Sequence, residues 1–412
     1  MGTLKIGNRV QKNRQLAFHY KNYNWFLAGS FLSETGDWLN RMALNWLVFT
    51  LTDSLLYIGL VEFCRMIPIL VFSIFGGVAA DKWERRKVII VTQLGAMCTT
   101  VALGFVVLSG VSSFLYLAIF LLIYGMFLAF EIPVRNALMP NLIPKEAMTS
   151  GLSFFSATLN LSRIIGPAAA GILLGVWSAP TLIFLNALSF LVSIGTLLII
   201  RPATDGVVAV RKQKFGASIK EALSFFRTHS IVFSVFVLGI VPMIFGFSYS
   251  TVMPAFAKDV LQLGPEGFGT LMSFAALGAI LASVALGFGR YPLPKGWLML
   301  VCIFLFGGGL VLVSLSSSYL WAVLSMFAIG LFSQAYRVIE RVIIQETIPD
   351  RLRGRILSIV MMDSGFIPFG NLLIGFLGGK VGTVATLCTM GVICMFAVLG
   401  ALLIKRQITT VQ

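Results

Sequence analysis

Histidine and cysteine are too scarce and too scattered to build most active sites that depend on them. The 412-residue chain has two histidines, His19 and His229, far apart in polar segments. Its five cysteines lie in apolar runs without a Cys-x-x-Cys pair, which is typical of small packing residues. Little material remains for a metal cluster or a Ser-His-Asp arrangement, and a Gly-rich nucleotide loop is missing. The sequence therefore predicts a protein that is not an enzyme and has no metal or cofactor.

Charged residues make up only 11% of the chain, whereas 58% is hydrophobic. A soluble protein of this length needs more polar surface, and several apolar runs reach the roughly 20 residues that cross a bilayer. The net charge of +15 is spread over short loops without a basic patch, so we expect no nucleic-acid partner. By the positive-inside rule, the side that carries most lysines and arginines is the cytoplasm. We predict a multi-pass protein of the bacterial cytoplasmic (inner) membrane, surrounded by lipid, with both termini in the cytoplasm.

Apolar segments separated by short loops predict an all-α polytopic membrane protein with twelve transmembrane helices in two six-helix bundles. The fourth is predicted to end at Pro133, and the seventh to run from Ile231 to Phe256. The linker between the two bundles, residues 201–230, is basic and partly amphipathic. A helix on the inner leaflet and a solvated linker are both consistent with this composition. The predicted parts are an N-terminal tail (1–23), a bundle (24–200), a linker (201–230), a second bundle (231–404) and a C-terminal tail (405–412).

An internal repeat supports this division. The segment from Asn136 to Ser153 aligns without gaps on the segment from Arg341 to Ser358. Each contains a helix end, an Ile-Pro break, a charged turn and the start of another helix. A six-helix half has therefore been duplicated, and a substrate site is expected between the halves near the middle of the membrane.

A charged cluster follows the second predicted helix, and its cations hold this end of the hairpin in the cytoplasm. The spacing of Gly77, Asp81, Lys82, Arg85 and Arg86 resembles the signature loop of the major facilitator superfamily. That resemblance implies two pseudo-symmetric six-helix bundles that alternate access to the substrate.

The same resemblance implies a gate. Asp81 is expected near the start of helix 11, around Ile356, and near Arg135 at the base of helix 4, so that the halves lock in the outward-facing state. Glu84 departs from the family pattern, which usually has Gly there, but drug-efflux and siderophore-export branches often carry an acid.

The fifth helix contains Gly166, Pro167 and Gly171, which resemble the Gly-Pro-centred antiporter motif of exporters. Pro167 removes a helical hydrogen bond and kinks the helix, while the glycines allow close packing on a partner such as helix 8. A kinked packing face without a further role is also compatible with these residues. The resemblance favours export over import.

Polar side chains within a span are costly, so each is a candidate functional residue. Glu34, Asp37, Arg41 and Asn45 are spaced 3, 4 and 4, which places them on one face of the first helix. Asp37 lies about 18 Å from the helix start at Trp25, near the middle of the hydrocarbon. Other candidates in predicted spans are Glu62, Arg65, Asn160, Arg163 and Asp363.

A buried carboxylate beside an arginine can exchange protons near neutral pH, so Asp37, Glu34 and Glu62 are the candidate proton carriers. The other polar residues are interpreted as charge partners that line a water-filled cavity. In the alternative, Asp37 with Arg41, and Glu62 with Arg65, are structural pairs. Asp363 is either a cytoplasmic gate or a second proton site. Arg337 and Glu340 are interpreted as a gate or a structural pair.

The order of features along the chain resembles the exporter branch that includes macrolide-efflux and enterobactin-export proteins. It implies a secondary active exporter, and the leading hypothesis is proton-coupled antiport of small amphipathic drugs or toxic metabolites by a monomer. A dedicated exporter of a siderophore or lipid-like metabolite, and a facilitator without proton coupling, are the alternatives. The features are Gly36-Asp37-Trp38, the signature loop, Gly166-Pro167, Pro254 to Asp259, and Gly354-Arg355 after Ile348-Pro349.

Overall fold

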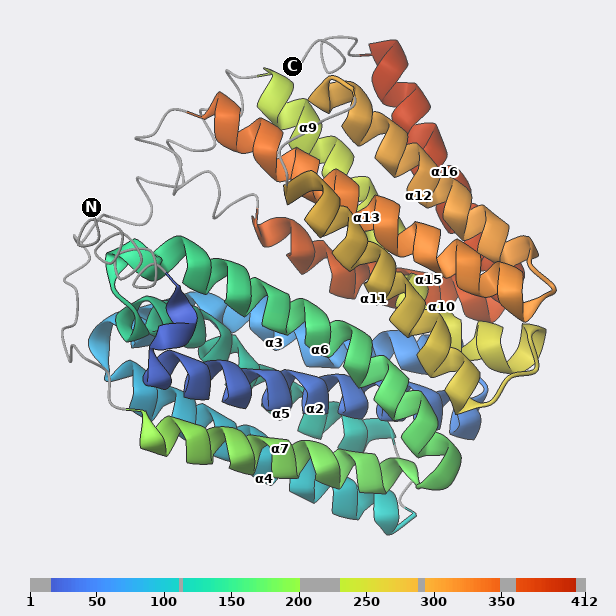
Figure 1. Cartoon of the computed structure of the whole chain (residues 1–412). Coiled ribbons are helices and arrows are strands. Elements are labelled where there is room, and N and C mark those ends of the chain that lie inside the picture. The colour runs from blue at the N-terminus through green and yellow to red at the C-terminus, as the bar shows by residue number, and fades with distance from the viewer. Residues whose placement is uncertain (1–15, 111–113, 201–229, 288–292, 349–360, 405–412) are drawn as a thin grey trace, which may run out of the picture. The chain divides into compact units, whose positions relative to one another are not determined.

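The computed structural model describes residues 16–110, 114–200, 230–287, 293–348 and 361–404, and the regular structure in these ranges is helical (Figure 1). The helices of the first half are η1 (Ala17–His19), α2 (Lys21–Thr52), α3 (Leu55–Lys82), α4 (Arg85–Leu108), α5 (Phe114–Leu138), η2 (Met139–Leu142), η3 (Lys145–Ala147), α6 (Met148–Val176) and α7 (Ala179–Ile199). Those of the second half are α9 (Ser230–Val241), η4 (Pro242–Gly246), α10 (Tyr249–Ala255), η5 (Phe256–Val260), α11 (Pro265–Gly287), α12 (Lys295–Leu315), α13 (Tyr319–Thr347), η6 (Met361–Phe366), α15 (Ile367–Val381) and α16 (Thr383–Ile404).

Ten helical segments in the described ranges are long and apolar enough to cross a membrane, so the chain is a multi-pass membrane protein. The first predicted span lies in α2, which carries three charged residues in its middle. The eleventh lies in α15, whose described part has 15 residues. The number twelve therefore stays a prediction.

Two compact units make up the structure. Unit 1 comprises Met1–Leu44 and Cys64–Val210, and unit 2 comprises Asn45–Phe63 and Arg211–Gln412. The end of α2 and the start of α3 thus group with the second half of the chain, whereas the predicted domains place them in the N-terminal bundle. Most of the predicted tails and linker, at 1–15, 201–229 and 405–412, lies outside the described residues.

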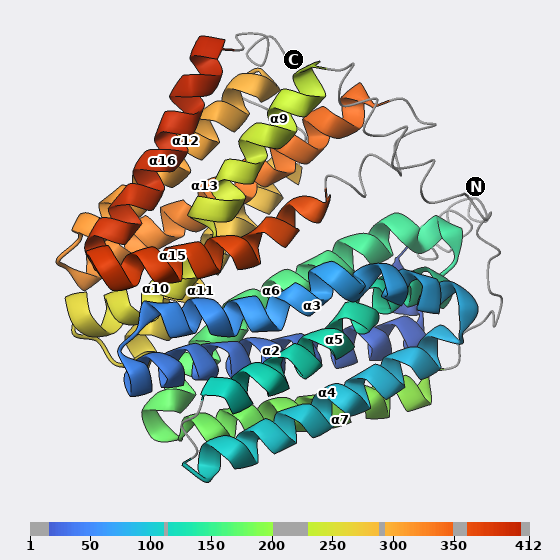
Figure 2. The same ribbon diagram turned by 180° about the vertical axis from the view of Figure 1, so that it is seen from behind.

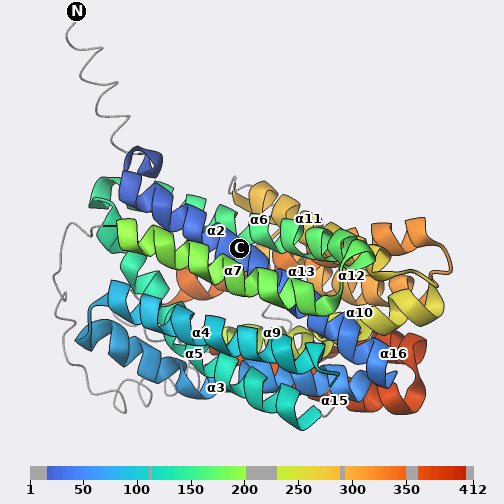
Figure 3. The ribbon, with the colours of Figure 1, turned by 90° about the horizontal axis from the view of Figure 1, so that it is seen from below.

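Each unit repeats the same neighbour relations. In unit 1, α4 packs beside α5 and α7, as Figure 3 shows. In unit 2, α12 packs beside α13 and α16 (Figure 2). Counted along the chain as predicted, these are helices 3, 4 and 6 and helices 9, 10 and 12. The contacts therefore correspond position by position, as the internal repeat predicts.

Glycines bring the helices of each unit into backbone contact. A Cβ atom at Gly76 of α3 would lie 2.5 Å from the carbonyl oxygen of Ala129 in α5. This carbonyl has no helical amide partner because residue 133 is proline, yet α5 continues to Leu138. The prediction that the fourth helix ends at Pro133 was wrong. In unit 2, a Cβ atom at Gly330 of α13 would likewise overlap the carbonyl oxygen of Ala275 in α11.

The segment predicted as one helix from Ile231 to Phe256 is divided into α9, η4, α10 and η5. The amide of Phe247 donates to the carbonyl of Pro242 over 2.8 Å, which closes a π-helical turn at η4. A second π-helical turn forms η5. Such turns displace the side-chain register of a helix and frequently occur at functional sites.

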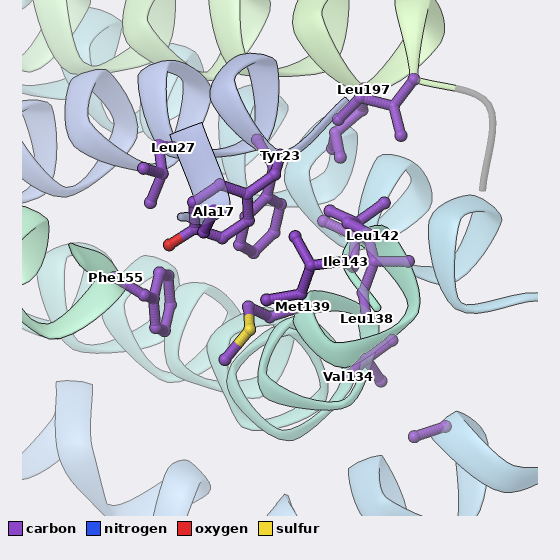
Figure 4. Packing of buried hydrophobic residues seen from close by; sticks show 14 of the residues in the cluster. Ala17, Tyr23, Leu27, Val134, Leu138, Met139, Leu142, Ile143, Phe155 and Leu197 are labelled. Carbon is purple, nitrogen blue, oxygen red and sulfur yellow. The ribbon is translucent and has the colours of Figure 1, made fainter. Parts of the chain in front are cut away.

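An apolar cluster closes one end of unit 1 around the start of α2 (Figure 4). The buried Tyr23 donates its hydroxyl hydrogen to the carbonyl oxygen of Gly151 over 2.5 Å, which joins α2 to the start of α6. Val134 and Leu138 of α5 belong to the same cluster. The cluster therefore fixes α5 against its neighbours at the level of Arg135, the residue next to Val134.

Candidate functional site

Asp37 of α2 lies at the junction of three helices in unit 1. Its carboxylate forms an ion pair with Arg65 of α3 and accepts a hydrogen bond from the hydroxyl of Tyr124 in α5. The Arg65 side chain is 8% exposed and that of Asp37 is 24% exposed. The guanidinium of Arg65 also lies 5.4 Å from the centre of the Tyr124 ring. These three residues, the Asp37 network, join α2, α3 and α5 through one carboxylate.

Arg135 of α5 organises a second set of contacts. It forms an ion pair with Glu34 of α2, one turn before Asp37, and its Nη1 lies 3.6 Å from Oε1 of Glu131. The same Glu131 oxygen accepts a hydrogen bond of 3.0 Å from Gln93 of α4. Glu131 is 1% exposed, and its Oε2 has no hydrogen-bond partner among the described residues. We call these four residues the Arg135 network.

Helical spacing explains why the two networks lie one above the other. On α5, Tyr124, Glu131 and Arg135 are separated by seven and four residues, so they share one face. On α2, Glu34 and Asp37 are three residues apart and share a face in the same way. The faces of α2 and α5 therefore meet along two layers of polar side chains.

The charges of the two networks do not balance. Glu34, Asp37 and Glu131 are acidic, whereas Arg65 and Arg135 are the two cations of the same contacts. Burial makes an uncompensated charge expensive, so a proton bound by one of the acids relieves the excess. The two networks therefore contain one more acid than arginine, and their ion pairs depend on the charge of each acid.

Glu62, the third predicted proton carrier, belongs to unit 2. It is 0% exposed, and its Oε1 accepts a hydrogen bond of 2.8 Å from the amide of Asn45 in α2. Asp363 is also in unit 2, buried within η6. The predicted carriers are thus divided between the units, with Glu34 and Asp37 together in the first.

The other predicted cavity residues have varied surroundings. The guanidinium of Arg41 lies 5.1 Å from the centre of the Trp38 ring on the same helix. On α6, Asn160 is half-buried and Arg163 is exposed.

The arginines of the signature loop bind the ends of other helices. Arg85 donates to the carbonyl oxygen of Ala137 over 2.9 Å, and Arg86 donates to that of Leu197 over 2.7 Å. These oxygens lie in the last turns of α5 and α7, where carbonyls lack helical partners and the helix dipole favours cations. Both arginines therefore stabilise the fold of unit 1.

Two other residues of the predicted gate, Asp81 and Gly77, have fewer close contacts than Arg135. Asp81 is exposed, and the segment around Ile356 expected to face it lies outside the described residues. A Cβ atom at Gly77 would meet no heavy atom of the described residues within 4 Å, unlike one at the neighbouring Gly76. Of these two glycines, Gly76 is therefore the one that packs closely on another helix.

The antiporter-like motif lies within α6, where Gly166, Pro167 and Gly171 are all buried. A Cβ atom at Gly166 would overlap Cβ of Trp38 in α2. The close contact at Gly166 is thus made with the first helix, and packing on helix 8 stays a prediction. Because Trp38 follows Asp37, the motif packs directly behind the Asp37 network.

Sequence reasoning missed Tyr124, Glu131 and Gln93. Glu131 had a detectable signal, because it is an acid inside an apolar span and lies four residues before Arg135. Gln93, a polar residue in the third span, had a weaker one. Tyr124 had none, since it is one aromatic residue among many in an apolar run.

Comparisons with known proteins agree with this architecture. The model of the family described as transmembrane secretion effector matches residues 16–411. The staphyloferrin A transporter of Staphylococcus aureus is 31% identical over 89% of this chain and 92% of its own. Macrolide efflux protein A of Streptococcus pyogenes is 25% identical, covering 88% and 92% of the two chains. A solved mutant of the nucleoside transporter NupG shares the fold with a TM-score of 0.77 at 13% identity, covering 93% of this chain and 99% of its own.

Proposed function

The chain belongs to the transmembrane secretion effector family of the major facilitator superfamily, and from that premise we propose that it is a proton-coupled antiporter with Asp37 as the proton carrier. It is a transporter of the exporter type and not an enzyme. The observation that carries the proposal is the Asp37 network, in which one carboxylate joins three helices.

Protonation changes every contact of this carboxylate. As an anion, Asp37 accepts charge-assisted hydrogen bonds from both Arg65 and Tyr124. A bound proton removes the negative charge, so Arg65 loses its ion pair and α3 is held less tightly to α2. The proton therefore shifts the balance between two arrangements of these helices.

The direction of coupling follows from the proton gradient. Asp37 takes up a proton when it is accessible from the acidic outer side and releases it inward, where the proton concentration is lower. Each release restores the ion pair with Arg65 and prepares the protein to bind substrate from the cytoplasm. Net proton entry thus drives substrate exit.

For the substrate, we favour amphipathic drugs or toxic metabolites, in keeping with the relative named macrolide efflux protein A. A second candidate is the dedicated export of a siderophore, because a relative at 31% identity is named a staphyloferrin A transporter. The two differ in selectivity, since a dedicated exporter accepts one chemical class. A monomer in the bacterial inner membrane, with cytoplasmic termini, completes the proposal.

Transport into inverted membrane vesicles tests both the proton coupling and the substrate class. Uptake of dyes, macrolides and siderophores is measured with an imposed gradient, acidic inside, for the wild type, Asp37→Asn and the control Asp53→Asn, whose exposed side chain pairs with Lys258. We expect gradient-driven uptake in the wild type and the control but not in Asp37→Asn. Uptake that ignores the gradient in the wild type would indicate facilitated export, and uptake restricted to siderophores would favour the second candidate.

A further inference from the structure

Glu340 in unit 2 is a buried acid outside the networks described above. It lies near the end of α13 and is 1% exposed. Its Oε1 has no hydrogen-bond partner among the described residues. A carboxyl group that is withdrawn from water without full hydrogen bonding costs far more free energy as an anion than as a neutral acid.

The carboxyl group of Glu340 packs against a glycine of the seventh segment. A Cβ atom at Gly239 of α9 would overlap Oε1 of Glu340 and lie 2.7 Å from its Cδ. The α9 helix contains no charged residue between Ser230 and Val241. Helix α9 therefore presents a close apolar surface to this side of the carboxyl group and offers no cation that would stabilise an anion.

Among the described residues, the charged groups that face Glu340 come from α13 and η6. Asp363, Arg337 and Arg341 all interact with it electrostatically. Asp363 is a second buried acid, and two neighbouring carboxylates oppose each other's ionisation. Arg337 is shared with an aromatic ring, because its guanidinium lies 5.2 Å from the centre of Phe247.

Tyr336, one turn before Glu340 on α13, adds a further polar group. Its side chain is fully buried, and its hydroxyl has no hydrogen-bond partner among the described residues. Its ring stacks on Phe306 of α12 at 6.2 Å, which fixes its position. Cys394 of α16 is the remaining titratable group nearby. Two neighbouring side chains of one helix face thus each have a buried polar atom without a hydrogen-bond partner in the part of the chain that the structure describes.

We propose that Glu340 is a second proton-binding site, located in the second unit and separate from Asp37. With its carboxyl group buried against Gly239, Glu340 holds the proton. When the contact between α9 and α13 opens to water, the O–H bond breaks, the proton passes to water and the carboxylate remains. Each half of the transporter then has its own titrating acid.

Infrared spectroscopy on the full-length protein in lipid nanodiscs, without any ligand, tests this site. We expect pH-difference spectra to contain a carboxylic acid C=O band that Glu340→Gln removes. Asp37→Asn should keep this band, as should Glu346→Gln, a control on α13 whose exposed acid pairs with Lys295. A wild type without a protonated carboxyl band, or a band that survives in Glu340→Gln, would overturn the proposal.

A second variant covers the case in which Glu340→Gln does not fold. Gly239→Ala keeps the acid but forces its carboxyl group to move, so the band assigned to Glu340 should shift in frequency. An unchanged band would contradict the proposed position of the proton. The antiport proposal can fail separately, since vesicle flux that ignores the gradient would leave the Glu340 band in place.

Discussion

The two units bury their acidic side chains in different surroundings. In unit 1, Asp37 and Glu34 each form an ion pair with an arginine from another helix. In unit 2, Glu340 packs against glycine and keeps an oxygen without a hydrogen bond among the described residues. Where an acid forms an ion pair with another helix, a change in its charge alters the contact that holds the two helices together. Where an acid is desolvated, its charge depends on whether water reaches it. The difference shows that one fold can couple protonation to movement in two physical ways.

The largest expected effect compares Arg65, which forms an ion pair with Asp37, with Arg337, which lies over the ring of Phe247. Arg65→Gln removes the ion-pair partner of Asp37, so we expect a loss of stability of about 3 kcal/mol, as for a broken buried pair. Arg337→Gln removes a cation held over Phe247 and should cost about 0.5–1 kcal/mol. Thermal unfolding of both variants in detergent measures the contrast. Equal losses of stability in the two variants would contradict the difference described between the two units.

Helix packing, in contrast, should be alike in the two units. Gly76→Ala and Gly330→Ala each push a methyl group against a backbone carbonyl, at Ala129 and Ala275, so each should cost about 1–3 kcal/mol. The adjacent Gly77→Ala is the matched control, because its added Cβ atom meets no atom of the described residues within 4 Å. Unfolding temperatures compare all three. A loss at Gly77 equal to that at Gly76 would contradict the packing described here.

A smaller effect compares the buried glutamates. Glu131→Gln keeps the contact with Gln93 but loses the charge that faces Arg135, so we expect a cost of about 1.5 kcal/mol. Glu340→Gln replaces a neutral acid by a neutral amide of similar size and should cost less stability than Glu131→Gln at neutral pH. Denaturation of both variants is compared in one detergent. A larger cost for Glu340→Gln would indicate that the acid is ionised in the folded state.

The smallest effect is expected at an exposed ion pair of unit 2. Lys258 lies 2.7 Å from Asp53, and their side chains are 35% and 74% exposed. Lys258→Met should therefore cost less than about 1 kcal/mol, and added salt should reduce the difference further. Unfolding at low and high salt checks this. A large loss of stability that added salt does not change would indicate that this exposed pair contributes as much as a buried ion pair.

The sequence predicts the side chains of the candidate site better than their partners. The spacing of Glu34 and Asp37 follows from the helical repeat, which is local and regular. The partners Arg65 and Arg135 were both named as candidates, but spacing pointed to Arg41, four residues from Asp37, as its structural partner. Contacts between helices depend on how each helix is rotated in the bundle, which spacing within one helix does not determine.

The signature loop shows the same limit. Its cations were expected to hold one end of the hairpin in the cytoplasm, and this expectation rests on charge. Arg85 and Arg86 also bind carbonyl groups at the ends of α5 and α7. These contacts depend on where the two helices end, which charge alone does not predict. The end of α5 was misjudged because Pro133 is tolerated inside the helix, where Gly76 packs on the freed carbonyl.

The most direct test of Asp37 as the proton carrier separates proton coupling from substrate translocation. Purified protein in proteoliposomes is assayed with a substrate found in the vesicle experiment, both for accumulation driven by a pH gradient and for exchange without one. We predict that Asp37→Asn retains exchange but loses gradient-driven accumulation, because translocation remains while its proton carrier is gone. Accumulation that persists in Asp37→Asn, or exchange that disappears with it, would contradict Asp37 as the proton carrier.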